Sequence, residues 1–289
     1  HSFESADKLL MHTSMYDDKE TYVYAAEYVD GYIIGVDANN DIFTMKAGDW
    51  NRTILGKLAV ESIFEFYPGG YEAGDYMMQT IEYPALDMAM DYTTKTLYVL
   101  TDESMMNGPN SGGHLLTLDW LTGTCTDLGK VTGLTDSHQA LTLACDNGGI
   151  LYTVDATTGD LYTLDKATAV ASFVGETGFE PRLQQTMAVD HETDKLYWAA
   201  YQGYDGDNRF LELNKQTGEV VSSTKMEYNS QLSSLYKPYE ADSTLVPDDV
   251  APTGLSLTPN RVTLKAGDTG SLRCMPQPYY CLLYTSDAA

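Results

Sequence analysis

The stretch from Ile150 to Gly175, "ILYTVDATTGDLYTLDKATAVASFVG", contains nearly the same phrase twice. "LYTVDATTG" begins at Leu151 and "LYTLDKATA" begins at Leu161. In each phrase, alternating apolar and polar residues run into a cluster of Asp, Thr, Ala or Gly, which is the pattern of a short strand followed by a tight turn. The stretch therefore predicts short antiparallel strands joined by hairpins.

This stretch belongs to a longer unit that recurs along the chain, with copies beginning at Leu86, Leu141 and Thr186 and a weaker copy at Tyr24. A Leu-Tyr pair marks the second strand of each unit at Leu97, Leu151 and Leu196, and Tyr32-Ile33 takes its place in the weaker copy. Repetition every 40–50 residues, roughly, with four short strands per unit, is typical of propeller blades. One such sheet cannot bury both of its faces alone, so we expect an all-β fold, a β-propeller of four-stranded blades with at least four visible.

The turns of these units have a local chemical cause. "DWLTG", "DATTG" and "NKQTG" begin at Asp119, Asp155 and Asn214. An Asp or Asn side chain accepts a hydrogen bond from the backbone two residues on, and the final Gly supplies the positive φ that closes the turn. We therefore expect these three residues to form turns rather than bind ligands, and we expect replacement of Gly159 or Gly218 to strain the backbone.

The last acid of each innermost strand is also expected to begin a turn; these acids are Asp91, Asp146 and Asp190. A ring of them around a central channel that binds a cation is the alternative. The four cysteines show no spacing typical of zinc sites. Because Cys125 and Cys145 are assigned to an outer strand and to the next blade's innermost strand, we expect them not to be bonded to each other.

Composition excludes some classes of partner. The chain has 17 Lys and Arg against 42 Asp and Glu, a formal net charge of −25. A polyanion repels phosphate backbones and anionic lipid, which argues against nucleic acid and membrane surfaces. No apolar run approaches the roughly 18 residues of a membrane-spanning helix, so membrane insertion is not expected.

Together, the repeats resemble the YncE-like and quinoprotein-like β-propellers, whose blades carry an L-Y-x-[LV]-D-x-x-T-G type of phrase. The resemblance covers roughly residues 20 to 240, and we assign residues 1–245 to the propeller. It rests on turn residues, so it implies the fold and says little about activity.

A second resemblance follows the propeller. After a linker at residues 246–251, "APTGLSLTPNRVTLKAGDTGSLRC" resembles the opening of a bacterial Ig-like domain of the Big2 type. The matching positions are Leu255, Leu257, Pro259, Val262, Leu264, Gly267 and Leu272. Residues 252–280 are thus expected to be a truncated Ig-like β-sandwich, a module that implies a secreted or surface-anchored bacterial protein. Residues 281–289, "CLLYTSDAA", resemble a translated sequencing adapter and are expected to be non-native.

The lengths of the connections between strands point to one face of the ring. The long connections are residues 59–85, 103–112, 176–185 and 202–208, and alternating strands place all of them on the same face. Insertions concentrate where a scaffold carries its function. The aromatic residues of 59–85 suit stacking on a sugar or a partner, or else fold over the edge of a blade.

The candidate ligand-binding residues on this face are Tyr67, Tyr71, Tyr204 and Asp205. The neighbouring oxygens of Asp205, Asp207 and Asn208 form a candidate calcium site, and no other cofactor is expected. No catalytic motif is present, so we expect a secreted or cell-surface binding or adhesion protein that takes an extracellular glycan or protein ligand. The alternatives are a propeller lyase or hydrolase acting on extracellular polysaccharide and a quinoprotein-like dehydrogenase.

Overall fold

The computed structural model describes nine stretches of the chain. They are residues 23–47, 51–65, 76–82, 84–102, 113–135, 138–226, 230–239, 254–258 and 273–277. The chain divides into two compact units, His1–Glu240 and Ala241–Ala289. Within the described residues every regular element is a strand, so the all-β prediction is confirmed, and none of them forms a helix that could cross a membrane.

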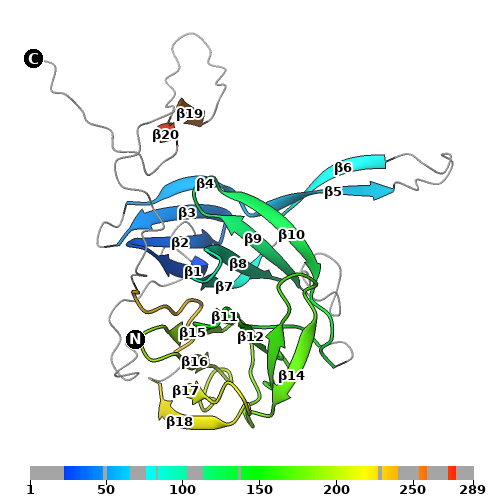
Figure 1. Ribbon diagram of the computed structural model, residues 1–289, viewed down its shortest axis with the longest axis vertical. Helices are drawn as coiled ribbons and strands as arrows, with labels where there is room; N and C mark the ends of the chain where they lie inside the picture. The colour runs from blue at the N-terminus through cyan, green and yellow to red at the C-terminus, as the bar shows by residue number, and fades with distance from the viewer. Residues whose placement is uncertain are drawn as a thin grey trace, which may run out of the picture. The chain divides into compact units, whose positions relative to one another are not determined.

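Sixteen strands of the first unit form four antiparallel four-stranded sheets arranged as a four-bladed propeller (Figure 1). The first blade comprises β1 (Val23–Val29), β2 (Tyr32–Asp37), β3 (Asp41–Lys46) and β4 (Thr53–Lys57). The second comprises β7 (Ala85–Asp91), β8 (Thr96–Thr101), β9 (His114–Asp119) and β10 (Thr124–Lys130). The third comprises β11 (Ala144–Cys145), β12 (Leu151–Val154), β13 (Leu161–Leu164) and β14 (Ala171–Gly175). The fourth comprises β15 (Thr186–Asp190), β16 (Lys195–Ala200), β17 (Arg209–Leu213) and β18 (Val220–Lys225).

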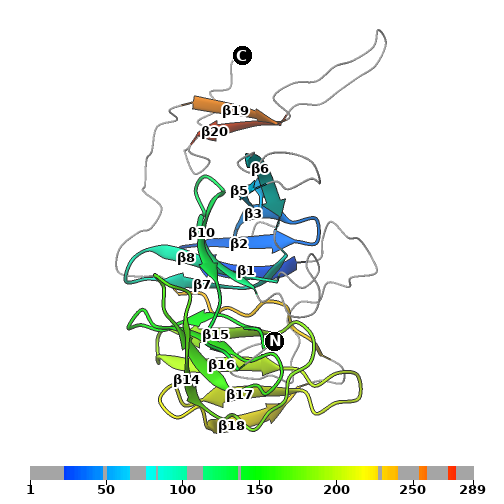
Figure 2. The same cartoon turned by 90° about the vertical axis from the view of Figure 1, so that its right-hand side faces the viewer.

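The repeated phrases occupy the predicted places. The Leu-Tyr pairs lie on the second strand of their blades, β8, β12 and β16, and Tyr32-Ile33 opens β2. In Figure 2 the first blade's strands descend from β3 to β1 and the fourth blade's strands descend from β15 to β18, so the innermost strands face the middle of the ring. The four-bladed arrangement thus confirms the fold that the repeats predict.

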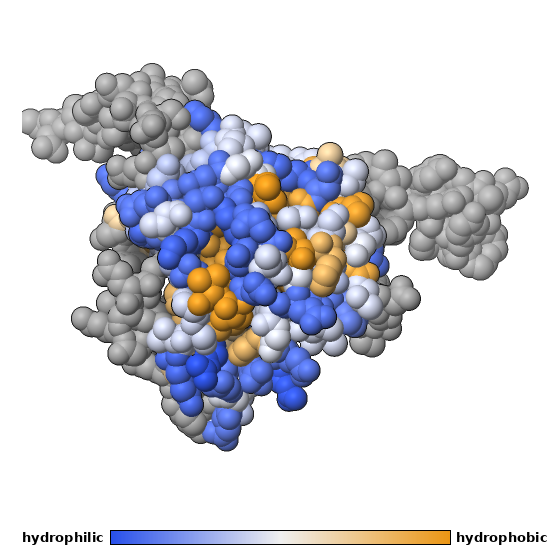
Figure 3. All heavy atoms as spheres, turned by 60° about the horizontal axis from the view of Figure 1, so that its bottom comes forward, coloured by the Kyte–Doolittle hydropathy of each residue, from blue (hydrophilic) through white to orange (hydrophobic). Residues whose placement is uncertain are grey.

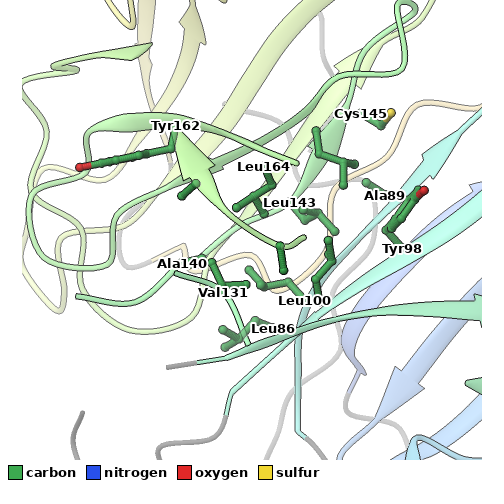
Figure 4. Close-up of a cluster of buried hydrophobic side chains, with 14 residues drawn as sticks. Leu86, Ala89, Tyr98, Leu100, Val131, Ala140, Leu143, Cys145, Tyr162 and Leu164 are labelled. Atoms are coloured by element: carbon green, nitrogen blue, oxygen red, sulfur yellow. The ribbon is translucent and has the colours of Figure 1, made fainter. Parts of the chain in front are cut away.

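Apolar side chains fill the space between neighbouring blades, which is why a single repeat is not stable by itself. One buried cluster joins the second blade to the third and includes Leu86, Leu100, Leu143 and Leu164 (Figure 4). A second cluster joins the third blade to the fourth around Trp198, which is fully buried. Each fully buried Leu contributes about 1.5–3 kcal/mol relative to an exposed one, so these contacts hold adjacent sheets together.

The predicted turns form as expected. The Oδ1 atoms of Asp119, Asp155 and Asn214 accept hydrogen bonds from the backbone nitrogens two residues on, at 2.9, 2.7 and 2.8 Å. The glycines that close these turns have φ values of 77°, 72° and 77°. Cys125 and Cys145 are both free, as predicted.

A buried carboxyl group on the innermost strand β7 links three blades. Asp87 Oδ2 accepts hydrogen bonds from the backbone nitrogens of Leu143 and Met187, both at 2.9 Å, and Oδ1 accepts one from Thr186 Oγ1 at 2.9 Å. Burial raises the pKa of Asp87 to about 8, against the opposing effect of these hydrogen bonds. Nearby, Gln184 Nε2 donates to the Tyr24 carbonyl of the first blade at 2.6 Å. Polar side chains therefore join the blades at the centre of the ring.

Ion pairs join the blades where the innermost strands end. Asp91 pairs with Lys166, Asp146 with Lys215, and Asp190 with Lys237. Lys166 and Lys215 belong to the turn between the third and fourth strands of the next blade, and Lys237 follows the fourth blade. These acids begin turns as predicted, and their carboxylates also stabilise the contact with the next element.

We expect Lys166→Met to lower the free energy of unfolding at pH 7. Burial opposes ionisation of Asp91, but hydrogen bonds from Lys166, Thr93 and Thr94 outweigh it and lower the Asp91 pKa to about 2. A pKa depressed below the unfolded value gives stability that is present above about pH 4 and is lost as the pH falls toward 2. Urea titrations should show a deficit of about 1 kcal/mol at pH 7 that shrinks below pH 4, because Lys166 is partly exposed and supplies only one of the hydrogen bonds that lower the Asp91 pKa. Lys225→Met, at an exposed site on β18, is the control, and an equal deficit in both variants would contradict this account.

The connection at 59–85 is not one long loop, which corrects the expectation from sequence. Its two ends form an antiparallel hairpin of β5 (Ala59–Glu65) and β6 (Tyr76–Glu82). Figure 1 shows this hairpin extending away from the blades. In the second unit, β19 (Gly254–Thr258) pairs antiparallel with β20 (Arg273–Gln277). The Ig-like assignment of that unit stays a prediction.

Candidate functional site

A hollow of about 470 Å³ lies where three connections between strands meet. They are the turn between β12 and β13, the connection from β14 to β15, and the loop between β16 and β17. The residues that line the hollow are Ala156, Thr157, Glu180, Pro181, Arg182, Gln202 and Gly206. Two of the four long connections that the sequence placed on one face of the ring, 176–185 and 202–208, thus contribute to one concave surface.

The connection 176–185 presents its charged side chains outward because its apolar residues are anchored. Phe179 is buried and packs edge to face on Trp198, with ring centroids 5.3 Å apart, and Pro181 is also buried. Glu180 and Arg182 alternate with them and are exposed. This alternation is the one that an extended chain gives when one face packs on a core.

Backbone contacts fix Arg182 in place. Its amide nitrogen donates to the Tyr201 carbonyl at 2.8 Å, and its carbonyl accepts from Gln185 Nε2 at 3.0 Å. Gln185 is fully buried, and its Oε1 also accepts a hydrogen bond from Trp198 Nε1 at 3.0 Å. The guanidinium is therefore carried by an ordered backbone.

The loop between β16 and β17 is held by Asn208. This side chain is 2% exposed, and its Oδ1 accepts a hydrogen bond from the Gln202 backbone nitrogen at 2.8 Å. Its Nδ2 donates to the Gly203 carbonyl at 3.4 Å. The amide of Asn208 thus orders the loop that brings Gln202 and Gly206 to the hollow.

The charges of the hollow are not neutralised within the described part of the chain. Glu180 and Arg182 form no ion pair or side-chain hydrogen bond there. Most other cations near the blade ends are paired, as Arg209 is with Asp207 at 2.8 Å. A guanidinium and a carboxylate at one polar hollow offer donors and acceptors to a ligand that carries both kinds of group.

Two large side chains are exposed on the connections that line the hollow. Leu183 is 68% exposed and Tyr204 is 75% exposed, each in a loop that lines the hollow. Leu183 also has a φ of 61°, a conformation that a leucine rarely adopts. An exposed leucine in a strained backbone conformation next to Arg182 supports a functional role for this loop.

Exposed apolar residues elsewhere lie mainly on outermost strands, as Phe173 does on β14 and Val221 on β18. On the face seen in Figure 3, hydrophobic patches alternate with hydrophilic residues and do not form one continuous apolar surface. Scattered apolar residues of this kind are normal for a protein surface. They do not define a second site.

The residues proposed from sequence fall in different places. Tyr67 and Tyr71 lie outside the described residues. Tyr204 and Asp205 lie on the loop that lines the hollow but are not among its lining residues. Calcium binding by Asp205, Asp207 and Asn208 stays a prediction; in the described part of the chain no three His, Cys, Asp or Glu side chains gather closely enough to hold a metal ion.

One histidine on the same side of the ring is held by a buried acid. His138 Nδ1 lies 2.8 Å from Asp155 Oδ2, and the Asp155 side chain is fully buried. The turn that Asp155 begins supplies Ala156 and Thr157 to the hollow. An imidazole oriented in this way by a carboxylate is an arrangement that also serves as a general base.

Sequence reasoning missed Thr157, Glu180 and Gln202 as candidate binding residues. Glu180 and Gln202 stand in connections that do not repeat from blade to blade, and Thr157 stands in a repeated turn that the sequence explained by backbone geometry alone. The one available signal was the run "FEPR" at residues 179–182, in which apolar and charged residues alternate next to a proline.

No protein-family model matches the chain, and no curated protein matches its sequence. Solved structures are similar at low identity. A Bacteroides thetaiotaomicron protein of unknown function has a TM-score of 0.45 and 13% identity over 69% of this chain and 42% of its own. A luciferin-regenerating enzyme has a TM-score of 0.42 and 16% identity over 74% of this chain and 79% of its own. Kuenenia stuttgartiensis hydrazine synthase has a TM-score of 0.36 and 17% identity over 58% of this chain and 42% of its own. This chain thus spans less than half of the first and third proteins, and none of these likenesses bears on ligand or activity.

Proposed function

We propose that the propeller is a binding module whose hollow takes a hydroxyl-rich ligand, an extracellular glycan. The observation that carries the proposal is the unpaired Glu180 and Arg182 at a polar hollow, with Leu183 and Tyr204 exposed on the connections that line it. Sugars present hydroxyl groups that suit a carboxylate and a guanidinium, and they present C–H faces that suit an aromatic ring. Display on the cell surface or secretion is part of the proposal and rests on the resemblances in sequence.

Arg182→Ala should weaken glycan binding at least about tenfold, because a charge-assisted hydrogen bond is lost. A glycan array on the full chain identifies the sugar, and calorimetry with that sugar measures the affinity. Glu180→Gln should also weaken binding. Lys130→Ala removes an exposed charge that does not line the hollow and should leave the affinity unchanged. Absence of any bound glycan, or unchanged affinity in Arg182→Ala, would contradict the proposal.

The second candidate is an enzyme that acts on polysaccharide, and the His138–Asp155 pair is the observation that favours it. A lyase needs a base to remove a proton next to a uronate carboxylate and a cation to neutralise that carboxylate. His138 and Arg182 have the matching chemistry. A screen of uronate-containing polysaccharides for new unsaturated ends, with His138→Gln as the inactive comparison, distinguishes this candidate from simple binding.

A further inference from the structure

The seam between the fourth and first blades is built differently from the two seams described above. At the second–third and third–fourth seams one buried cluster spans both sheets. Among the residues that the structure describes, the fourth–first seam has two separate clusters. The fourth blade contributes Ala188, Ala199, Phe210 and Met226, and the first contributes Ala26, Tyr28, Ile33, Phe43 and Met45.

Residues 230–239, which follow the fourth blade, contact both clusters. Leu235 is 6% exposed and belongs to the fourth blade's cluster. Tyr236 packs on the first blade's cluster and stacks on Tyr28, with ring centroids 6.3 Å apart. Successive side chains of one segment therefore pack on opposite sheets, as the side chains of an extended chain do.

Polar contacts fix the register of this segment. Ser233 Oγ donates to the Val23 carbonyl of the first blade at 2.6 Å. Lys237 Nζ donates to Asp190 Oδ1 and Glu192 Oε2 of the fourth blade, both at 2.8 Å. At its end, Tyr239 packs edge to face on Tyr92. The segment contains no strand, so side chains and not a backbone ladder make these contacts.

We propose that the fourth–first seam is a peptide-binding groove that residues 230–239 occupy in cis. Its specificity is for an extended segment that carries Leu, Tyr and Lys in succession, as Leu235, Tyr236 and Lys237 do. The acids Asp190 and Glu192 select the cation, and the two apolar clusters select the Leu and the aromatic ring. Ring closure then depends on recognition of this segment.

The test uses the full chain and cuts it once, so that the segment is no longer covalently joined to the four blades. A protease recognition sequence replaces residues 227–229, and the purified protein is cleaved there. Residues 230–289 should stay with residues 1–226 on gel filtration at micromolar concentration. Lys237→Glu should weaken retention at least about tenfold, because it places a like charge against Asp190 and Glu192.

Lys225→Glu makes the same charge change at an exposed site on β18 and should retain the fragment. Circular dichroism of the uncut protein will show whether Lys237→Glu folds. If it does not, Tyr236→Ala serves as a second variant, and it should also retain less of the 230–289 fragment. Separate elution of the unmutated fragment would overturn the proposal. So would equal retention in every folded variant.

Discussion

Asp87→Ala should lower the free energy of unfolding of the propeller by about 4 kcal/mol. The substitution leaves the backbone nitrogens of Leu143 and Met187 and the hydroxyl of Thr186 without their acceptor inside a buried site. Each buried donor left unsatisfied costs about 1–3 kcal/mol. For a unit of this size the loss corresponds to a fall in melting temperature of about 10 °C, measurable by urea and thermal titration of the full chain.

A graded comparison separates this effect from the loss of packing. Asp87→Asn keeps one acceptor oxygen for Leu143 and Met187 and turns its amide toward Thr186, so about half of the loss should remain. Glu176→Ala removes an exposed carboxylate and should change stability by less than about 0.5 kcal/mol. If Asp87→Ala is within 1 kcal/mol of the unmutated protein, Asp87 does not link the blades.

Features with a local cause could be predicted from the sequence. Each Leu-Tyr pair lies on a second strand because alternation of apolar residues sets which face is buried. Asp155 and Asn214 form turns because an Asx side chain bonds to its own backbone two residues on. These relations need only a few consecutive residues, so a single sequence is enough to predict them.

Features that join distant segments could not be predicted. Asp87 bonds to Leu143 and Met187, 56 and 100 residues away, and nothing in "LDMAMD" distinguishes a linking acid from a turn-former. The segment 230–239 was assigned to the propeller, but its place at the fourth–first seam could not be predicted, because its residues contact two different blades and show no periodicity. The hollow escaped prediction for the same reason, since Glu180, Arg182 and Gln202 meet only after the third and fourth blades have packed.

Gly159→Ala should destabilise the propeller by about 3 kcal/mol or more, through two separable causes. Gly159 has a φ of 72°, a conformation that costs an L residue about 1–2 kcal/mol. A Cβ atom at this position would also lie 1.8 Å from the Phe179 carbonyl oxygen, a distance that forces the backbone to move. The sequence predicted the first cause from the turn and gave no sign of the second.

Gly178→Ala isolates the first cause. Gly178 has the same φ of 72°, and a Cβ atom there meets nothing within 4 Å. Its replacement should therefore cost only about 1–2 kcal/mol, measured by urea titration beside Gly159→Ala. Because Thr177 Oγ1 donates to the Gly159 carbonyl at 2.8 Å, displacement at Gly159 also moves the connection that carries Glu180 and Arg182. Gly159→Ala should then weaken ligand binding as well as folding. Equal losses of stability in the two variants would contradict this expectation. They would mean that the connection moves without loss of free energy and that its close contact with the turn does not position the hollow.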